Sequence, residues 1–353
     1  SGQTTPTSSG ASQSLTITAS DNVALSTVTC RVDSGANTSC IGGTYATGVL
    51  AAGSHTITVI ATDTVGNATT QTATIVVDQT APTVSITGAT SPTRFTTSQT
   101  ATITASDNVA LASQTCRLNS GTPAACTTSF ASGVLTVGTN TITVVATDTS
   151  GNVTTQTATI VVDQTAPGVS ITGLTSPTNS TASQTAAITT TDNVAIASQT
   201  CRLDSGSNTA CTNSYATGAM AAGTHTITVI ATDTAGNVTT QTATIVVDTT
   251  VPTLSISGLT TPTNSTASQT ATITAADNVA LSSVTCRLDS GATTSCVGGT
   301  YATGVLTAGT HTVTVIATDT AGNQTTQTST IVVDATAPTL SISGQTSPTA
   351  SSA

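Results

Sequence analysis

Apolar and small polar residues alternate in short stretches along this chain. In Thr310–Thr318 three apolar residues fall on one face of an extended strand and the threonines fall on the other. The two sets are Val313, Val315 and Ala317 against Thr312, Thr314 and Thr318. An alternation with a period of two predicts β-strands that bury one face and expose the other to water.

Seven such stretches, separated by turn residues, occupy the part of the chain that ends at Asp334. They are Pro252–Ser257, Ser268–Ala275, Val284–Asp289, Thr294–Val297, Tyr301–Leu306, Thr310–Thr318 and Thr325–Asp334. No stretch carries apolar residues at helical spacing, and the abundant Thr and Val favour strands. We therefore predict an all-β fold in which each unit is a seven-stranded antiparallel β-sandwich.

Pairs of cysteines mark the repeats of this pattern. The two cysteines of a pair are ten residues apart, and successive pairs follow at steps of 86, 85 and 85 residues. A period this long indicates tandem domains, because solenoid repeats run to about 20–50 residues. We expect four domains, called repeats 1 to 4 below, in residues 1–78, 79–163, 164–248 and 249–334. In this division repeat 1 lacks its first strand, and residues 335–353 are a spare first strand of a following unit.

The eight cysteines fit an oxidising, extracellular compartment. A zinc site is the alternative, but it needs two close Cys or His pairs per module, and each repeat has one. We predict disulfides that each close a loop of about 11 residues and contribute about 3 kcal/mol in the chain-entropy model. The predicted bonds are Cys30–Cys40, Cys116–Cys126, Cys201–Cys211 and Cys286–Cys296.

Charged residues are few and of two kinds. All 15 acidic residues are Asp and all five basic residues are Arg, so the net charge is −10. So few cations argue against a nucleic-acid partner, because nothing would neutralise a run of phosphates. No apolar run approaches the ~20 residues of a membrane span. The sequence shows no signal peptide, so we expect either a removed leader or an excerpt of a longer chain.

A resemblance to a known family rests on two adjacent blocks, GTHTVTVIATDTAGN in residues 309–323 and TIVVDATAPT in residues 330–339. They resemble bacterial immunoglobulin-like and hyalin-type repeats, which are similar to fibronectin type III in architecture. The resemblance covers essentially the whole chain and implies an extracellular or cell-surface bacterial protein, such as an adhesin stalk or a filament. Its motifs carry no catalytic or ligand signature, and most such repeats lack the cysteine pair, so no partner is inherited.

Three aspartates recur in each repeat: before the third strand, in the turn after the sixth strand, and at the end of the seventh. In an immunoglobulin-like sandwich the last of these faces the other two of the next repeat. Three carboxylates, with Asn108, Asn152 and linker carbonyls, would supply the oxygen ligands that Ca²⁺ takes. Local turn chemistry is the alternative, since Asp and Asn favour turns. The candidate calcium ligands are Asp78, Asp107, Asp148, Asp163, Asp192, Asp233, Asp248, Asp277 and Asp319.

An arginine follows the first cysteine of each pair, and an acidic residue stands two positions later in three repeats. We expect a solvated Arg–Asp pair on one strand face, with a charged contact point for a neighbour as the alternative. A histidine begins the sixth strand in the same three repeats, and we expect no catalytic or metal role for it. The acidic residues are Asp33, Asp204 and Asp289, and the histidines are His55, His225 and His311; repeat 2 has Asn119 and Asn140.

The segment after Asp334 has the pattern of a first strand. Leu340 and Ile342 share one face and can enter a core, and Pro338 is tolerated at the start of an edge strand. Because an open sheet edge accepts another strand, this segment can complete repeat 1 of a following unit. That unit is either covalently continuous in a longer array or a separate copy, and both give head-to-tail assemblies.

These observations predict a non-enzymatic structural protein of an extracellular filament or adhesin stalk. Its expected partners are copies of itself or adjacent repeats, and Ca²⁺ at the junctions is the one candidate cofactor. A carbohydrate- or receptor-binding surface module is an alternative, but the four copies are nearly interchangeable and lack aromatic platforms. Ice binding through threonine rows such as Thr56-Ile57-Thr58 is another, although any solvated strand shows such rows.

Overall fold

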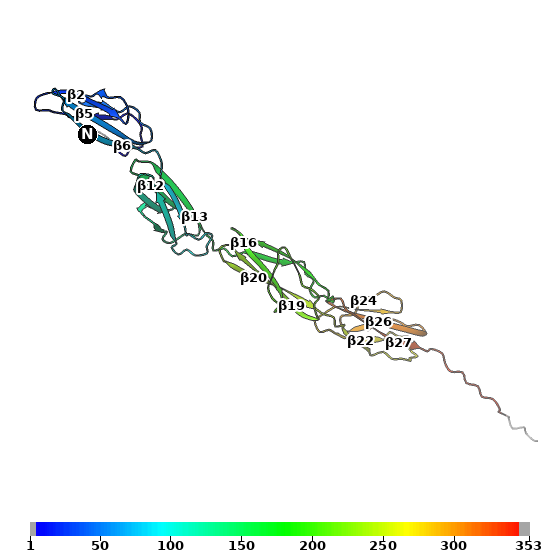
Figure 1. Ribbon diagram of the computed structural model, residues 1–353. Coiled ribbons are helices and arrows are strands. Elements are labelled where there is room, and N and C mark those ends of the chain that lie inside the picture. Colours follow the sequence, from blue (N-terminus) through cyan, green and yellow to red (C-terminus); the bar gives the residue numbers. More distant parts are fainter. Residues whose placement is uncertain (1–4, 346–353) are drawn as a thin grey trace, which may run out of the picture. The chain divides into compact units, whose positions relative to one another are not determined.

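The computed structural model describes residues 5–345, in which the chain forms strands, turns and loops (Figure 1). Within this range 27 strands make up eight sheets, and neighbouring strands in a sheet run antiparallel. The described residues include no helix, and so none that is long and apolar enough to cross a membrane. Apart from the short turn Asp233–Asn237, one compact unit ends at Ala166 and a second begins at Pro167. The predicted all-β fold is confirmed.

Repeat 2 shows a complete sandwich within the first unit. One sheet has three strands in the order β11-β8-β7, and the other has four in the order β10-β9-β12-β13. Ile103 of β8 and Val144 of β12 belong to one buried core, so the two sheets pack face to face. The strands are β7 Thr83–Thr87, β8 Thr100–Ser106, β9 Leu111–Leu118, β10 Ala124–Ala125, β11 Ser129–Ala131, β12 Gly138–Asp148 and β13 Val153–Val162.

Repeats 3 and 4, in the second unit, have the same topology. Repeat 3 has β14 Gly168–Thr172, β15 Thr185–Thr191, β16 Ile196–Leu203, β17 Thr209–Ala210, β18 Ser214–Ala216, β19 Gly223–Asp233 and β20 Val238–Val247. Repeat 4 has β21 Thr253–Ser257, β22 Thr270–Ala276, β23 Leu281–Leu288, β24 Thr294–Ser295, β25 Thr300–Ala302, β26 Gly309–Asp319 and β27 Gln324–Val333. The fifth strand is shorter than predicted, because Gly304 turns the chain at a positive φ of 72°.

Repeat 1 has six strands among its described residues. They are β1 Ser14–Thr16, β2 Leu25–Val32, β3 Thr38–Ser39, β4 Thr44–Ala46, β5 Gly53–Asp63 and β6 Ala68–Val77. The four-stranded sheet, in the order β3-β2-β5-β6, matches those of the other repeats, whereas the opposite sheet contains only β1 and β4. Repeat 1 thus lacks a counterpart of β7, β14 and β21 in the part of the chain that the structure describes.

The central strand β26 buries one face as predicted. Val313, Val315 and Ala317 are fully buried, because this face lies between the two sheets of repeat 4. The opposite face is less exposed than predicted. Thr314 is only 9% exposed, since its cross-strand neighbours Arg287 and Thr328 stand on either side of it.

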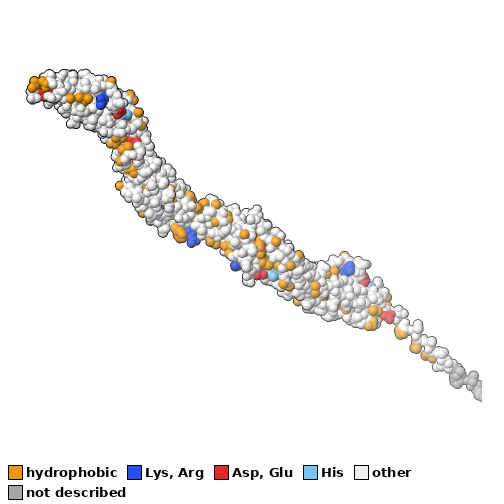
Figure 2. Space-filling view, viewed as in Figure 1, with side chains coloured by type: hydrophobic (Ala, Val, Ile, Leu, Met, Phe, Trp, Pro, Cys, Tyr) orange, Lys and Arg blue, Asp and Glu red, His pale blue; other side chains and the backbone are white. Residues whose placement is uncertain are grey.

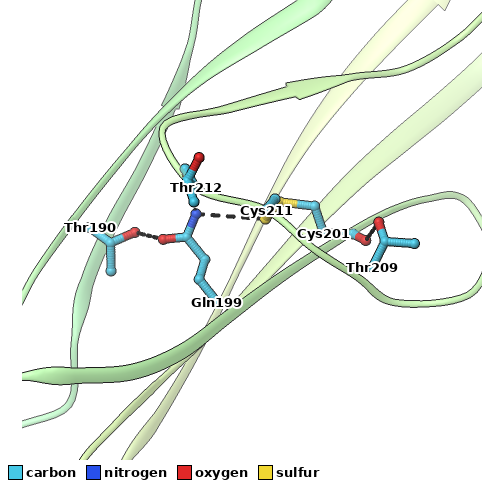
Figure 3. Close-up of a disulfide and its surroundings, with 6 residues drawn as sticks. All are labelled: Thr190, Gln199, Cys201, Thr209, Cys211 and Thr212. Carbon is cyan, nitrogen blue, oxygen red and sulfur yellow. Dashed lines mark hydrogen bonds between the residues drawn. A yellow bond between two sulfur atoms is a disulfide. The ribbon is translucent and has the colours of Figure 1, made fainter.

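Each repeat contains one disulfide, in the pairing that the sequence predicts. The bonds join Cys30 to Cys40, Cys116 to Cys126, Cys201 to Cys211 and Cys286 to Cys296. In repeat 3 the bond ties β16 to the segment just after β17, and Gln199 packs beside it (Figure 3). The Gln199 amide donates to the carbonyl oxygen of Thr212 and accepts from the Thr190 hydroxyl, so it also links β15 to the loop that follows β17.

Candidate metal centres at the domain junctions

Three aspartates meet where repeat 1 passes into repeat 2. Asp78 follows the last strand of repeat 1, Asp107 lies in the loop between β8 and β9, and Asp148 is the last residue of β12. Their nearest carboxylate oxygens all lie within 4.8 Å of one another. The prediction that these three side chains converge across the junction therefore holds in the structure.

Two of the three carboxylates keep one oxygen without a partner. Asp78 accepts hydrogen bonds at Oδ1 from the Thr80 amide (3.1 Å) and from Nδ2 of Asn108 (3.1 Å). Asp107 accepts at Oδ2 from the Val109 amide at 2.9 Å. The remaining atoms, Oδ2 of Asp78 and Oδ1 of Asp107, are buried and have no hydrogen-bond donor. Asp78 as a whole is only 3% exposed, so this oxygen is shielded from bulk water.

Asp148 is held ionised by its own turn. Burial raises the pKa of Asp148, but the hydrogen bonds from Asn152, Ser150 and Gly151 outweigh it and keep the pKa below its ordinary value. Oδ1 accepts from the amides of Ser150 and Asn152, both at 2.8 Å, and Oδ2 accepts from Nδ2 of Asn152 at 2.7 Å. The turn therefore delivers a negative charge to the junction at neutral pH.

The second unit contains the same arrangement between repeats 3 and 4. Oxygens of Asp248, Asp277 and Asp319 lie within 4.8 Å of one another. Asp248 is 3% exposed, and its Oδ2 is buried without a donor, as is Oδ1 of Asp277. Burial raises the pKa of Asp319, and hydrogen bonds led by that of Asn323 lower it further than burial raises it. The same two aspartates of the cluster thus each have one unpaired oxygen at both junctions. This geometry is therefore a recurring property of the repeats.

The remaining candidate ligands occupy the equivalent places in their own repeats. Asp163 follows β13, Asp192 follows β15, and Asp233 is the last residue of β19. A shared ion among these three stays a prediction.

A cation of the Ca²⁺ type fits this donor set. Buried, ionised carboxylates are stable when they are paired or when they coordinate a metal ion. All donors are oxygens, which hard cations prefer, and no sulfur or imidazole is present among them. Two ligands on opposite sides of a Ca²⁺ ion lie up to about 5 Å apart, so oxygens within 4.8 Å of one another can share one such ion.

The asparagines near the junction use their amide nitrogens to hold the linker, and coordination of an ion by their side-chain oxygens stays a prediction. Nδ2 of Asn152 donates to the carbonyl oxygens of Asp78 (2.9 Å) and Thr80 (3.3 Å). Nδ2 of Asn323 does the same to Asp248 (2.8 Å) and Thr250 (3.2 Å). Because these amides donate to the linker carbonyls, Asn152 and Asn323 fasten the linker of one repeat to the β-hairpin of the next.

The predicted pair between Arg31 and Asp33 is wrong. Strand β2 ends at Val32, and Asp33 takes a left-handed φ of 51°, which turns its side chain toward β5. There Oδ2 lies 2.8 Å from Nδ1 of His55, and Oδ1 accepts from the Thr56 amide at 2.7 Å. Nη1 of Arg31 instead lies 3.4 Å from the Asn37 side chain.

The same His–Asp pair recurs in repeats 3 and 4, between His225 and Asp204 and between His311 and Asp289. Sequence reasoning missed it, although a signal was present. Repeat 2 replaces both members together, and there Asn119 donates to Asn140 at 3.3 Å. The joint replacement indicates that the two positions are in contact.

The sequence matches the family described as bacterial Ig-like domain (group 3) in residues 42–122, 124–205, 209–300 and 297–353. Among solved structures it is similar to a tetra-tandem repeat in the extending region of a large adhesion protein, with 26% identity and a TM-score of 0.37. That similarity covers 94% of this chain and 97% of the other.

Two further similar structures show lower identity. The fibronectin(III)-like modules of Clostridium thermocellum CbhA are 16% identical, with 47% of this chain and 94% of theirs covered and a TM-score of 0.33. Cadherin domains 3–6 of protocadherin gamma B2 are 14% identical, with 93% and 96% covered and a TM-score of 0.32. No curated protein matches. Because the family matches together span well over half of its length, the chain belongs to the bacterial Ig-like domain (group 3) family.

Proposed function

We propose that this chain is a non-enzymatic structural protein of an extracellular filament or adhesin stalk. Repeats 1 to 4, divided after residues 78, 163, 248 and 334, are its successive building blocks. Four disulfides, one in each sandwich, support an oxidising location outside the cytoplasm. Family membership supports a bacterial surface protein.

The observation that carries this proposal is the buried, unpartnered oxygen of Asp78 at the junction between repeats 1 and 2. A Ca²⁺ ion bound by Asp78, Asp107 and Asp148 would join the end of one sandwich to two loops of the next. Bending at the junction would then separate ligands from the ion, so ion binding favours one geometry of the joint. Domains joined in this way suit a stalk that must hold its reach.

Assembly between chains is the other part of the proposal. Copies associate head to tail, with the strand after Asp334 of one chain added to an open sheet edge of another. Contacts of this heterologous kind extend into open filaments, because the same two surfaces stay available at the ends.

Calorimetry on the whole chain tests the junction ions. Ca²⁺ should raise the melting temperature relative to a chelator, and titration calorimetry should detect saturable binding. Asp248→Asn should weaken this response, because it removes a ligand at the junction between repeats 3 and 4. At low protein concentration Asp334→Asn is the matched control, since Asp334 ends its repeat in the same way but is exposed. Identical melting in Ca²⁺ and in chelator would contradict the proposed ion sites.

A further inference from the structure

One sheet of repeat 1 has an open edge. In repeat 2 the first strand, β7, pairs with β8 over five residues, from Thr83 opposite Ser106 to Thr87 opposite Thr102. In repeat 1 no strand among residues 5–345 pairs along the equivalent edge, and β1 covers only Ser14–Thr16. Residues 17–20 are therefore not part of a strand, although they correspond to the end of the seven-residue strand β8.

The core beneath this edge is open as well. Val59 and Ala61 of β5 are half-buried, whereas the equivalent Val144 and Ala146 of repeat 2 are fully buried. The buried residues of repeat 1 form two clusters, while those of repeat 2 form one. A groove of about 680 Å³ runs along this side of repeat 1, and its apolar lining includes Leu15, Ile17, Ala19, Leu25, Val59 and Ala61.

The chain carries a second copy of the sequence that forms the first strand of repeat 4. Residues Pro338–Gly344 have the sequence PTLSISG, which is identical to that of Pro252–Gly258. In the latter, strand β21 pairs with β22 and packs two side chains, Leu254 and Ile256, against the core of repeat 4. In Pro338–Gly344 the equivalent side chains, Leu340 and Ile342, are 89% and 84% exposed. Figure 2 shows hydrophobic side chains along this segment beyond the last sandwich.

We propose that residues 334–344 of one copy fill the groove in repeat 1 of a second copy. This inference rests on the head-to-tail assembly proposed above and specifies the surface that accepts the strand. The pairing of β21 with β22 sets the register, in which Leu254 lies opposite Ala275 and Ile256 opposite Ile273. The copy that supplies the strand is called the donor, and the copy that receives it is called the acceptor. By the same register, Leu340 of the donor lies opposite Ala19 of the acceptor, and Ile342 lies opposite Ile17.

The same contact completes a fourth carboxylate cluster, from Asp334 of the donor with Asp21 and Asp63 of the acceptor. Each already has the local hydrogen bonds that its counterpart makes at the internal junctions. Asp334 accepts from the Thr336 amide at 3.0 Å, and Asp21 accepts at Oδ2 from the Val23 amide at 2.8 Å. Asp63 accepts from Nδ2 of its hairpin asparagine at 2.7 Å, as Asp148 does. Strand donation should therefore be promoted by Ca²⁺.

Light scattering on the chain of residues 1–353, with negative-stain electron microscopy, tests the strand. The parent chain should form linear multimers whose mass rises with protein concentration. Leu340→Asp/Ile342→Asp places two charges on the core-facing side of the donor and should leave the protein at its monomer mass of 34.3 kDa. Ser341→Asp/Ser343→Asp adds the same two charges on the outward face and should still assemble. A parent chain that stays monomeric, or a Leu340→Asp/Ile342→Asp variant that assembles normally, would overturn the proposal.

Peptide binding separates this inference from the proposed junction ions. A fluorescent peptide of residues 334–344 should bind the monomeric Leu340→Asp/Ile342→Asp chain, as measured by anisotropy, whereas the peptide with Ser at both apolar positions should not. Chelation should weaken binding about tenfold, and Asp63→Asn in the chain should remove this calcium effect. Binding without a calcium effect would remove the fourth cluster and keep the strand. No binding, with internal junctions that still respond to Ca²⁺, would refute only the strand.

Discussion

Nδ1 of His55 lies 2.8 Å from Oδ2 of Asp33, and the other ring nitrogen, Nε2, lies 2.9 Å from the carbonyl oxygen of Ala51. Both neighbours accept hydrogen bonds, so both ring nitrogens can donate only when the imidazole is protonated. The hydrogen bond to Asp33, and then that to Ala51, raises the pKa of His55 above its ordinary value of 6.5. Protonation is thus coupled to the folded structure of repeat 1, and equally of repeats 3 and 4.

We predict that repeats 1, 3 and 4 are most stable in mildly acidic solution. The raised pKa of His55 gives stability that is full below about 6.5 and is lost as the pH rises through the folded pKa. The hydrogen bond from His55 lowers the pKa of Asp33, which gives stability above about 3.8 that is lost as the pH falls through its folded pKa. The pairs therefore stabilise most between these limits, and the melting temperature should fall as the pH is raised from about 6 to about 9.

Repeat 2 supplies the control for this prediction, because its asparagine pair does not titrate in this range. Asp289→Asn/His311→Asn in repeat 4 copies the pair formed by Asn119 and Asn140. Scanning calorimetry in matched buffers should show that the transition of repeat 4 loses its decline above neutral pH. A variant with the same pH profile as the parent chain would show that the His–Asp pair does not control it.

The sequence predicts those features of the fold that depend on periodicity or on spacing. Alternation in Thr310–Thr318 identifies a strand, and the constant distance from Cys286 to Cys296 identifies the disulfide. Convergence of the junction aspartates is also predictable, since it follows from the strand order of a sandwich. The His–Asp pair is not, because it depends on the left-handed backbone of Asp33 one residue beyond the strand, and a period-two pattern assigns that residue to the wrong face.

Removing one disulfide should destabilise one repeat. For Cys286→Ala/Cys296→Ala we expect a loss of about 3 kcal/mol in the free energy of unfolding of repeat 4, since the bond restricts a short loop in the unfolded chain. Hydrogen exchange followed by mass spectrometry, under native conditions, resolves the four repeats from one another. Faster exchange confined to repeat 4 is expected. Peptides from the unreduced parent protein should contain the four bonds and no bond between repeats.

The asparagine that fastens the linker should have a measurable effect on the joint. Asn323→Ala removes the hydrogen bonds to the carbonyls of Asp248 and Thr250, each worth about 0.5–1.5 kcal/mol, as well as one within its own hairpin. Limited proteolysis near residues 249–252 should become faster. Asn67→Ala is the matched control, because Asn67 makes the same hairpin bond to Asp63. Asn67→Ala should leave cleavage near residues 249–252 unchanged, and an Asn323→Ala linker that is cleaved no faster than that of the parent chain would contradict the fastening role.

Identical strands in two contexts give the last prediction. Leu254→Ala/Ile256→Ala removes side chains that pack against the core of repeat 4. It should lower the free energy of unfolding of repeat 4 by about 2 kcal/mol for each residue. This value is at the lower end for core truncations, because both side chains are only half-buried. Leu340→Ala/Ile342→Ala makes the same chemical change at exposed positions, so the melting of the dilute monomer should stay the same. At high protein concentration the parent chain should gain stability in repeat 1 as the donated strand docks, and this gain should disappear in Leu340→Ala/Ile342→Ala. If that variant instead melts earlier when dilute, the two side chains pack within their own chain and are not available to a second copy.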